Sequence, residues 1–289
     1  MKIGIIGLGL MGGSFSYGIK ELFPNSEIFG FDISNDNYKI ATKLGIIDSK
    51  LNVNNIFDFK LILVSIPVDK SIDVLKIILD NVSDKTLVMD VGSTKKNICS
   101  KLKNHPNRKN FLATHPISGT ENSGPNAAIK KLYFNITNII CEPELTSPDK
   151  LNFAYSLFSK FNMKIINMDP ASHDEHISYV SHLSHITSFI LAKTVIQKEE
   201  NEKNIFDLAG SGFESTVRLA KSSSKMWAPI FLENKDNVIE ALDEYIKNLD
   251  ELKQLIVKND KKSIVNDLNN INRVKKILSG INNKKNEKQ

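Results

Sequence analysis

The sequence contains little cysteine and no long apolar run, and both shortages narrow the possible classes of protein. Among 289 residues only Cys99 and Cys141 are cysteines, without a CxxC spacing, so we expect reduced thiols, no disulfide framework and no zinc site. A bilayer-spanning helix needs about 20 mainly apolar residues, and no such run occurs. The first apolar run begins at Lys2, which leaves no room for a targeting peptide. We therefore expect a cytoplasmic protein without a membrane partner.

The excess of positive charge lies at the carboxyl end of the chain. The formal net charge is +5, and the segment from Arg273 onward accounts for it with six basic residues and one acidic residue: Arg273, Lys275, Lys276, Lys284, Lys285 and Lys288 against Glu287. The rest of the chain is close to neutral, so we expect no nucleic-acid partner. Residues 281–289 are predicted to form a disordered basic tail.

Arginine is also scarce. Arg108, Arg218 and Arg273 are the only arginines among 38 basic residues. Since lysine is the usual cation of this chain, an arginine inside a structural element indicates a two-point contact that lysine cannot make.

The chain changes character near residue 170. Before that point, short apolar runs alternate with helical or turn-rich segments, at 2–7, 27–32, 61–67, 86–92, 110–116, 134–142 and 163–169. Such runs are typical of strands buried on both faces of a mostly parallel sheet, which predicts an α/β doubly wound, Rossmann-type domain over 1–169. Helical patterns follow at 174–199, 204–220, 224–258 and 261–279. They predict an all-helical domain over 170–280 whose apolar stripes form a homodimer.

A glycine-rich turn follows the first predicted strand directly. It fits GxGxxG and consists of Gly7, Leu8, Gly9, Leu10, Met11 and Gly12. The first glycine allows the tight turn, the second lets the backbone approach a pyrophosphate, and the third lets helix and strand pack closely. The pattern therefore predicts a dinucleotide site in which phosphates meet the free N–H groups of a helix start.

Asp32 indicates which dinucleotide binds. It ends the second predicted strand, 20 residues after Gly12, where a carboxylate accepts hydrogen bonds from ribose hydroxyls and repels a 2′-phosphate. We therefore expect NAD rather than NADP as the cofactor. Two further strand ends should line the same crevice, at Ser65, Ile66 and Pro67 and at Gly92 and Ser93.

His115 is the candidate proton acceptor. It ends the run NFLATHP and precedes the polar loop ISGTENSG, and catalytic groups in such sheets lie at the carboxyl ends of strands. A neutral imidazole suits a general base that works near neutral pH. A histidine that merely caps a turn is the alternative interpretation.

Six motifs together resemble those of the prephenate dehydrogenases. They are GLGLMGGS, SIPV, DVGSTK, HPISGTENSG, SHLSH and RLAKSSSKMW, in the family's order and spacing and extending to about residue 235. The resemblance implies NAD-dependent oxidative decarboxylation of prephenate to 4-hydroxyphenylpyruvate, a step of tyrosine biosynthesis. It also implies that His115 accepts the proton of the ring hydroxyl.

The resemblance implies roles for further residues. Ser93 matches a serine that hydrogen-bonds both the histidine and the substrate hydroxyl, although it could also cap a helix that starts at Thr94. Arg218 matches the arginine that binds a substrate carboxylate. Four other residues match positions around the substrate pocket, with the tryptophan supplied by the partner subunit: Thr120, Glu121, His185 and Trp227.

The sequence leaves several residue roles and the choice of substrate open. Many family members carry an aspartate three residues before the substrate arginine, and Ser215 stands there in this chain, so the orientation of Arg218 is not fixed. The roles of His173, His176 and His182 are open, and we expect no metal ion. Arogenate or mixed cyclohexadienyl dehydrogenase is the near alternative; β-hydroxyacid dehydrogenase and a non-catalytic NAD sensor are remote ones.

Overall fold

A computed structural model describes residues 1–202 and 204–279 of the chain. These residues form two compact units, one comprising Met1–Asn237 and the other beginning at Val238, and each is described by itself. The predicted basic tail, 281–289, lies outside the described residues.

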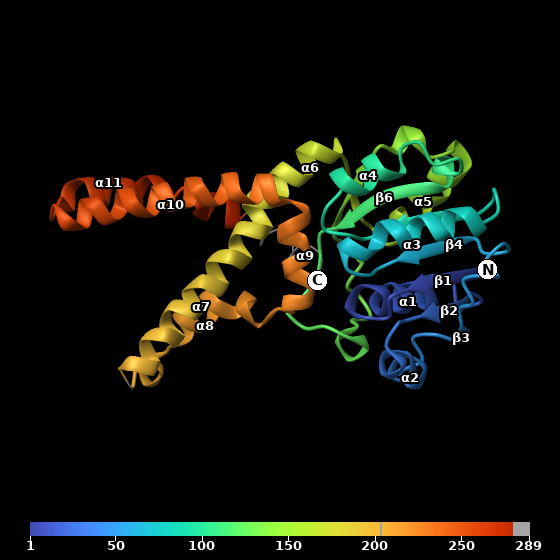
Figure 1. Cartoon of the computed structure of the whole chain (residues 1–289), viewed down its shortest axis with the longest axis horizontal. Helices are drawn as coiled ribbons and strands as arrows, with labels where there is room; N and C mark the ends of the chain where they lie inside the picture. The colour runs from blue at the N-terminus through green and yellow to red at the C-terminus, as the bar shows by residue number, and fades with distance from the viewer. Residues whose placement is uncertain (203, 280–289) are drawn as a thin grey trace. The chain divides into compact units, whose positions relative to one another are not determined.

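The first unit is built on an eight-stranded sheet in the order β3-β2-β1-β4-β5-β6-β7-β8 (Figure 1). Its strands are β1 Lys2–Ile6, β2 Glu27–Phe31, β3 Ser49–Lys50, β4 Leu61–Val64, β5 Leu87–Asp90, β6 Phe111–Pro116, β7 Thr137–Cys141 and β8 Lys164–Asn167. All neighbours pair in parallel except β6 and β7, which are antiparallel. The predicted doubly wound, mostly parallel sheet is confirmed.

The seven apolar runs all become strands because successive side chains enter two separate cores. In β4, Leu61 and Leu63 belong to one buried cluster, whereas Ile62 and Val64 belong to the other. Strand β3 was not predicted, since it is only two exposed polar residues beside β2.

Helices cover both faces of the sheet. One core receives side chains from α1 Leu10–Leu22, α2 Asn35–Lys43 and α5 Pro148–Lys160. The other receives them from α3 Val68–Asn81 and α4 Lys96–Leu102. Short 3-10 turns lie between these elements, at η1 Arg108–Asn110, η2 Pro125–Ala127 and η3 Pro143–Leu145.

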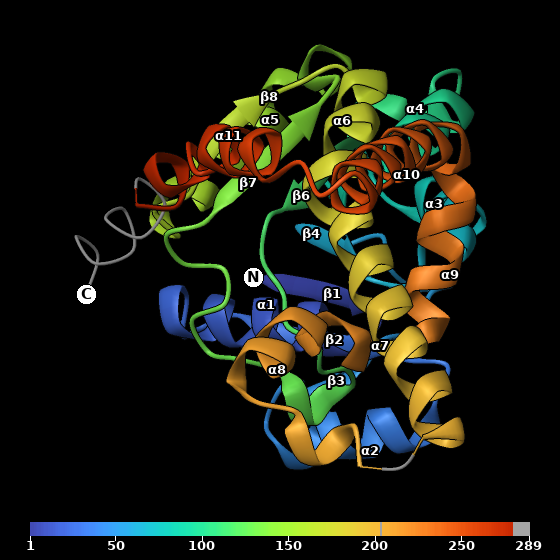
Figure 2. The same ribbon diagram turned by 90° about the vertical axis from the view of Figure 1, so that its left-hand side faces the viewer.

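The helical part of the first unit begins three residues after β8. Helix α6 Pro170–Ile177 continues through the π-helical turn η4 Ser178–His182 into α7 Leu183–Asn201. After it come η5 Phe206–Leu208, α8 Ser211–Val217, η6 Arg218–Lys221 and α9 Ser224–Glu233. Helix α7 contacts α8, and the two lie side by side in Figure 2. Helix α9 contacts α3, one of the helices that cover the sheet.

Two helices predicted from the sequence are each interrupted. The segment 204–220 is divided into short helical turns, since Gly210 has an extended backbone conformation and precedes α8. The segment 224–258 divides at Asn234, whose φ of −109° and ψ of 29° end α9.

Helix α10 Lys235–Val257 leads into the second unit, which also contains α11 Lys261–Ile271. Asn259 takes a left-handed conformation with φ of 52° after α10, as asparagine tolerates at a helix end. The Asp260 carboxylate then accepts the Ser263 N–H at 3.1 Å and caps α11. Within the described residues, no helix is both long and apolar enough to cross a bilayer.

Candidate active site

The glycine turn after β1 has the geometry that the sequence predicted. Gly7 has a φ of +91°, and a Cβ on it would lie 2.3 Å from the Ser65 carbonyl oxygen. A Cβ on Gly12 would lie 2.0 Å from the Gly7 carbonyl oxygen. Gly9 precedes α1 without a side-chain cap, and the nearest atom to a Cβ there would be 3.9 Å away. The first N–H groups of α1 therefore face open space that suits a phosphate.

Asp32 is held rigidly beside this turn. Its Oδ2 accepts the Leu8 N–H at 2.9 Å, and its Oδ1 accepts the Ser34 N–H at 2.9 Å and the Asn37 side-chain N–H at 3.2 Å. Leu8 is the second residue of the glycine turn, so the carboxylate is tied to the turn itself. This arrangement fits an adenosine ribose whose hydroxyls meet Asp32.

The residues after β4 lie against the same turn. The Ser65 hydroxyl donates to the carbonyl oxygens of Ile6 at 3.1 Å and Gly7 at 2.7 Å. Ile66 is partly buried, and Pro67 stands at the cap position of α3. Since β1, β2, β4, β5 and β6 run parallel, Gly7, Asp32, Ser65, Ser93 and His115 all lie at the carboxyl edge of the sheet. We expected this shared edge from the sequence.

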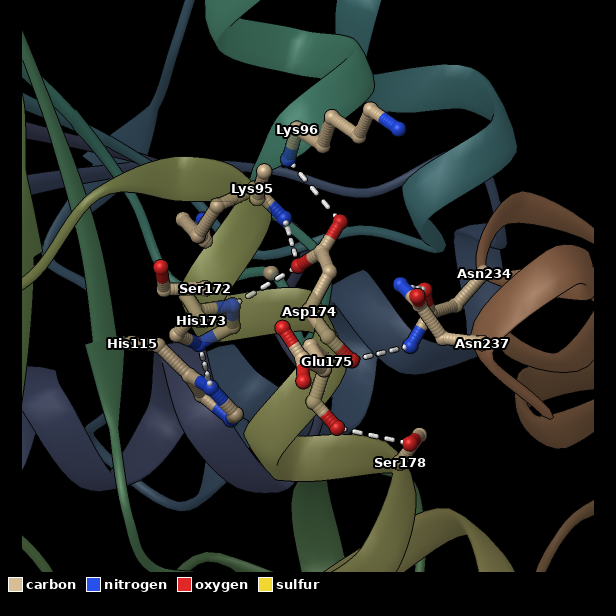
Figure 3. A network of polar contacts seen from close by, with 12 residues as sticks. Lys95, Lys96, His115, Ser172, His173, Asp174, Glu175, Ser178, Asn234 and Asn237 are labelled. Carbon is tan, nitrogen blue, oxygen red and sulfur yellow. Dashed lines mark hydrogen bonds and ion pairs between the residues drawn. The ribbon is translucent and has the colours of Figure 1, made fainter. Parts of the chain in front are cut away.

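His115, at the end of β6, belongs to a chain of buried polar groups (Figure 3). Its Nδ1 lies 2.8 Å from Nε2 of His173, and Nδ1 of His173 lies 2.7 Å from Oδ1 of Asp174. His173 and Asp174 are buried and belong to α6. His173 is 58 residues away from His115 along the chain. The sequence left the role of His173 open and did not single out Asp174.

Asp174 also fixes the start of α4. Its two carboxylate oxygens accept the N–H groups of Lys95 at 2.7 Å and Lys96 at 2.9 Å. The Asn234 side chain donates to the Asp174 carbonyl oxygen at 2.6 Å (Figure 3). The Lys95 ammonium is fully buried and pairs with the buried Asp90 carboxylate at the end of β5. The α4 start, Asp174 and His115 thus form one connected cluster.

The alternative role of Ser93 as a helix cap does not hold. Helix α4 begins at Lys96 rather than Thr94, its N-cap position is Lys95, and the Asp174 carboxylate accepts the N–H groups there, because Ser93 is two residues before the cap position. His115 Nδ1 meets His173, and the hydrogen bond expected between Ser93 and His115 stays a prediction. Ser93 itself is partly buried at the carboxyl edge of the sheet.

The cluster keeps His115 unprotonated. Burial lowers the pKa of His115 well below the usual histidine value, and the nearby His173, Lys95 and His182 lower it further. The imidazole is therefore neutral at pH 7 and can accept a proton.

The π-helical turn η4 places two more histidines beside the only tryptophan. The His185 ring stacks on Trp227 with ring centroids 3.5 Å apart, and its Nδ1 donates to the Ser181 carbonyl oxygen at 3.0 Å. The fully buried His182 packs edge-on against Trp227 and lies 3.2 Å from the Asn234 side-chain amide. Burial lowers the pKa of His185, and it lowers the pKa of His182 to about 4.

Trp227 is buried by its own chain. Its ring contacts His182, His185 and Phe231 of the same chain, and the expectation that it lines the pocket of the partner subunit stays a prediction. The packing of α9 beside η4 and α7 brings these rings together. Within the described residues, Trp227 Nε1 and His182 Nε2 have no hydrogen-bond partner although both are buried.

Arg218, in η6, has a carboxylate partner that the sequence did not predict. Its Nη1 donates to Oε2 of Glu121 at 2.7 Å. Ser215 instead donates to the Gly212 carbonyl oxygen at 3.0 Å. Thr120 accepts the Asn122 N–H at 3.2 Å in the same loop as Glu121. The pKa of Glu121 is lowered, chiefly because its carboxylate accepts a hydrogen bond from its own backbone N–H. Partial desolvation opposes this shift, and Arg218 adds to it.

The thiols and the carboxylates form no evident metal site. No group of three or more His, Cys, Asp or Glu side chains within the described residues is placed to hold a metal ion. Cys99 and Cys141 are buried and unpaired. Burial raises the pKa of both thiols, that of Cys141 to about 12, so neither thiol is a ready nucleophile.

Two family models match the chain. "Prephenate dehydrogenase, nucleotide-binding domain" matches residues 15–167, and "Prephenate dehydrogenase, dimerization domain" matches residues 169–270. A prephenate dehydrogenase of Lactococcus lactis is 34% identical over 272 residues, which cover 91% of this chain and 73% of that protein. A cyclohexadienyl dehydrogenase of Zymomonas mobilis is 25% identical over 261 residues, which cover 89% of each chain.

A solved structure agrees with this assignment. The crystal structure of prephenate dehydrogenase from A. aeolicus in complex with hydroxyphenyl propionate and NAD+ is 32% identical to this chain. It has a TM-score of 0.86 and covers 96% of this chain and 97% of its own. The NAD+ in that protein, together with the nucleotide-binding model, supports the predicted NAD cofactor. The chain belongs to the prephenate dehydrogenase family.

Proposed function

We propose that this chain catalyses the NAD-dependent oxidative decarboxylation of prephenate to 4-hydroxyphenylpyruvate. The observation that carries the proposal is the position of His115. A neutral imidazole lies at the carboxyl edge of the same parallel sheet as the glycine turn and Asp32. A proton acceptor at this edge, close to a nicotinamide, is what oxidation of a ring alcohol requires.

The chain's residues fit the cofactor. The N–H groups at the start of α1 would hold the pyrophosphate, and Asp32 would hold the adenosine ribose. Ser65, Ile66, Pro67 and Ser93 line the crevice toward the nicotinamide. When bound, NAD+ supplies the acceptor for the hydride that leaves the ring carbon bearing the hydroxyl.

His115 moves the proton of the reaction. It takes the hydroxyl proton as the ring carbon is oxidised, and Ser93 hydrogen-bonds the same hydroxyl. The carbon–carbon bond to the ring carboxylate then breaks, CO2 leaves, and its electron pair enters the ring, which becomes aromatic. Prephenate and NAD+ give 4-hydroxyphenylpyruvate, CO2 and NADH without a net proton, so His115 returns its proton to the new phenol oxygen.

Charged and aromatic residues from the helical part hold the dianionic substrate. Arg218 binds one carboxylate in two-point contact, and Thr120 and Glu121 close the pocket beside it. The His185 ring, braced by Trp227, forms part of the wall, and its Nδ1–H is already used by Ser181. His185 therefore presents Nε2 to the substrate. Hydroxyphenyl propionate, bound in the A. aeolicus protein, is a phenol with a carboxylate side chain, as the proposed product is.

A mixed cyclohexadienyl specificity is the second candidate, which the similarity to the Zymomonas mobilis protein favours. Arogenate carries an ammonium where prephenate carries a keto oxygen. Measuring kcat/KM for both substrates with NAD+ tests the proposal. We expect a preference for prephenate of at least tenfold, and equal efficiency would favour the second candidate.

The chain acts as a homodimer through its helical residues. The match to a dimerization domain supports this assembly. In the second unit, Ile246, Leu249, Ile256 and Leu268 remain exposed on α10 and α11, and such apolar faces are usually covered by a partner. Sedimentation should show a dimer at micromolar concentration, and a stable monomer would contradict this assembly.

A further inference from the structure

We propose that His173 and Asp174 are positioning residues that hold the His115 imidazole with its proton on Nδ1 and its lone pair on Nε2. This inference rests on the proposed role of His115 as the base. His173 and Asp174 are buried, and the proposed reaction does not otherwise use their side chains (Figure 3).

The Asp174 carboxylate determines which nitrogen of His173 carries a proton. It already accepts two backbone N–H groups, from Lys95 at 2.7 Å and Lys96 at 2.9 Å, so both of its oxygens act as acceptors. His173 Nδ1 lies 2.7 Å from the same carboxylate, so this nitrogen must carry a proton. A His173 ring that carries this single proton has its lone pair on Nε2.

His173 in turn determines which nitrogen of His115 carries a proton. His173 Nε2 accepts, and His115 Nδ1 lies 2.8 Å from it, so His115 Nδ1 must donate. A neutral imidazole has only one ring proton. Nε2 of His115 is therefore the unprotonated nitrogen, which is the atom a general base needs to present to a hydroxyl.

Two hydrogen bonds connect His115 to the buried charges of the cluster. Asp90 and Lys95 form an ion pair in which both side chains are fully buried, and they neutralise each other. The Asp174 carboxylate adds a further acceptor, which lies 2.7 Å from His173 Nδ1. It therefore holds the His173 ring in place, and His173 in turn holds His115.

The anchoring of Asp174 makes this arrangement rigid. Both carboxylate oxygens are fixed by the start of α4, and its backbone carbonyl accepts Asn234 Nδ2 at 2.6 Å. Asp169 caps α6 just before the dyad by accepting the N–H groups of Ala171 and Ser172. His173 and Asp174 are thus held both by the start of α4 and by the helices that follow α6. Because the two residues are fixed, the ring orientation of His115 is fixed as well.

His173 is the better site for the test, because removing Asp174 would also uncap α4. His173→Leu removes both nitrogens that contact Asp174 and His115. His173→Gln keeps a side-chain oxygen that can accept from His115 Nδ1. His176→Leu changes an exposed histidine on the same helix and serves as the matched control.

The direct measurement is the ring ¹⁵N spectrum of histidine-labelled protein at pH 7, with His115 assigned through the His115→Asn variant. We expect wild type, His176→Leu and His173→Gln to show His115 protonated at Nδ1 only. His173→Leu should show a mixture of the two tautomers. This spectrum needs no substrate, so it tests the inference even if the proposed reaction fails.

The kinetic measurement is kcat with saturating NAD+ and substrate. We expect His173→Leu to lower kcat by about 10- to 100-fold, as removing a group that orients a histidine does, with the KM for NAD+ unchanged. His173→Gln should recover most of the loss. A wild-type His115 protonated at Nε2, or a His173→Leu variant with unchanged tautomer and kcat, would overturn the inference. A wild-type enzyme inactive on both substrates would instead refute the proposed function.

Discussion

Arg218 Nη1 lies 2.7 Å from Glu121 Oε2, although the two residues are 97 positions apart in the chain. The Glu121 loop thus supplies the carboxylate that the sequence lacks at position 215, and it orients the guanidinium. The side chain of Arg218 is 51% exposed and that of Glu121 is 23% exposed. Exposed ion pairs contribute little to stability. Orientation of Arg218, rather than stability, is what this pair provides.

Replacing Arg218 should therefore weaken substrate binding far more than folding. A charged hydrogen bond is worth about 1.5–3 kcal/mol, so we expect Arg218→Gln to raise the KM for prephenate by about 10- to 100-fold. The KM for NAD+ should stay within about threefold. Arg273→Gln, at an exposed arginine on the carboxyl-terminal side, is the control and should leave both constants unchanged. An unaltered KM for prephenate in Arg218→Gln would remove Arg218 from the substrate site.

Replacing the base should separate chemistry from cofactor binding. A positioned general base contributes about 10²–10⁴-fold to the rate, so His115→Asn should lower kcat by that amount. Calorimetry should show NAD+ binding within about threefold of wild type, because the cofactor contacts lie at the ends of β1 and β2. His176→Asn is the matched control. Full activity in His115→Asn would show that another group accepts the proton.

Asp32 should control the choice between NAD+ and NADP+. In Asp32→Asn the negative charge that repels a 2′-phosphate is gone. The amide also loses an acceptor for the Leu8 or Ser34 N–H. We expect the ratio of kcat/KM for NAD+ over NADP+ to fall by about tenfold or more. Asp36→Asn, at an exposed carboxylate in the first turn of α2, should keep the wild-type ratio; an unchanged ratio in Asp32→Asn would count against the assignment.

His182 should make the folded state sensitive to acid. Burial lowers its pKa to about 4 in the folded chain, whereas an unfolded histidine titrates near about 6.5. Between these values the unfolded chain binds a proton that the folded chain does not, so stability is lost as the pH falls through this window. The loss from this residue is on the order of 3 kcal/mol.

The test is the free energy of unfolding, measured with urea from pH 7 to pH 4. His182→Asn keeps a polar group near Asn234 but cannot titrate, so its stability should fall less steeply with acid than that of the wild type. His176→Asn should follow the wild-type slope. Equal slopes for His182→Asn and wild type would show that His182 is not the group responsible.

Local patterns predicted the sheet and one wall of the site. The seven apolar runs and the glycine turn could be predicted because each depends only on residues that are neighbours in the chain. Asp32 could be predicted because it lies at a fixed number of residues after the glycine turn. The division of 224–258 at Asn234 was missed because asparagine does not end a helix by itself. In the structure the Asn234 side chain is held by Asp174 and His182 instead.

The contacts that orient the catalytic groups are long-range, so no local pattern reveals them. His115 and His173 are 58 residues apart, and Asp174 reaches Lys95 across 79 residues. A signal was nevertheless present: a His-Asp pair follows the helix cap at Asp169 by four and five residues, and both side chains are buried. The sequence assigned the orienting role to Ser93 because the serine resembles its family counterpart.

The proposed oxidative decarboxylation requires His115, NAD+ and the pocket around Arg218 to act together. Its most direct test follows NADH formation and CO2 release from purified protein with prephenate and NAD+. We expect one NADH and one CO2 for each 4-hydroxyphenylpyruvate formed, and a rate that falls by at least about 100-fold in His115→Asn. NADH formed without CO2, or no turnover of prephenate by a folded protein that binds NAD+, would contradict it.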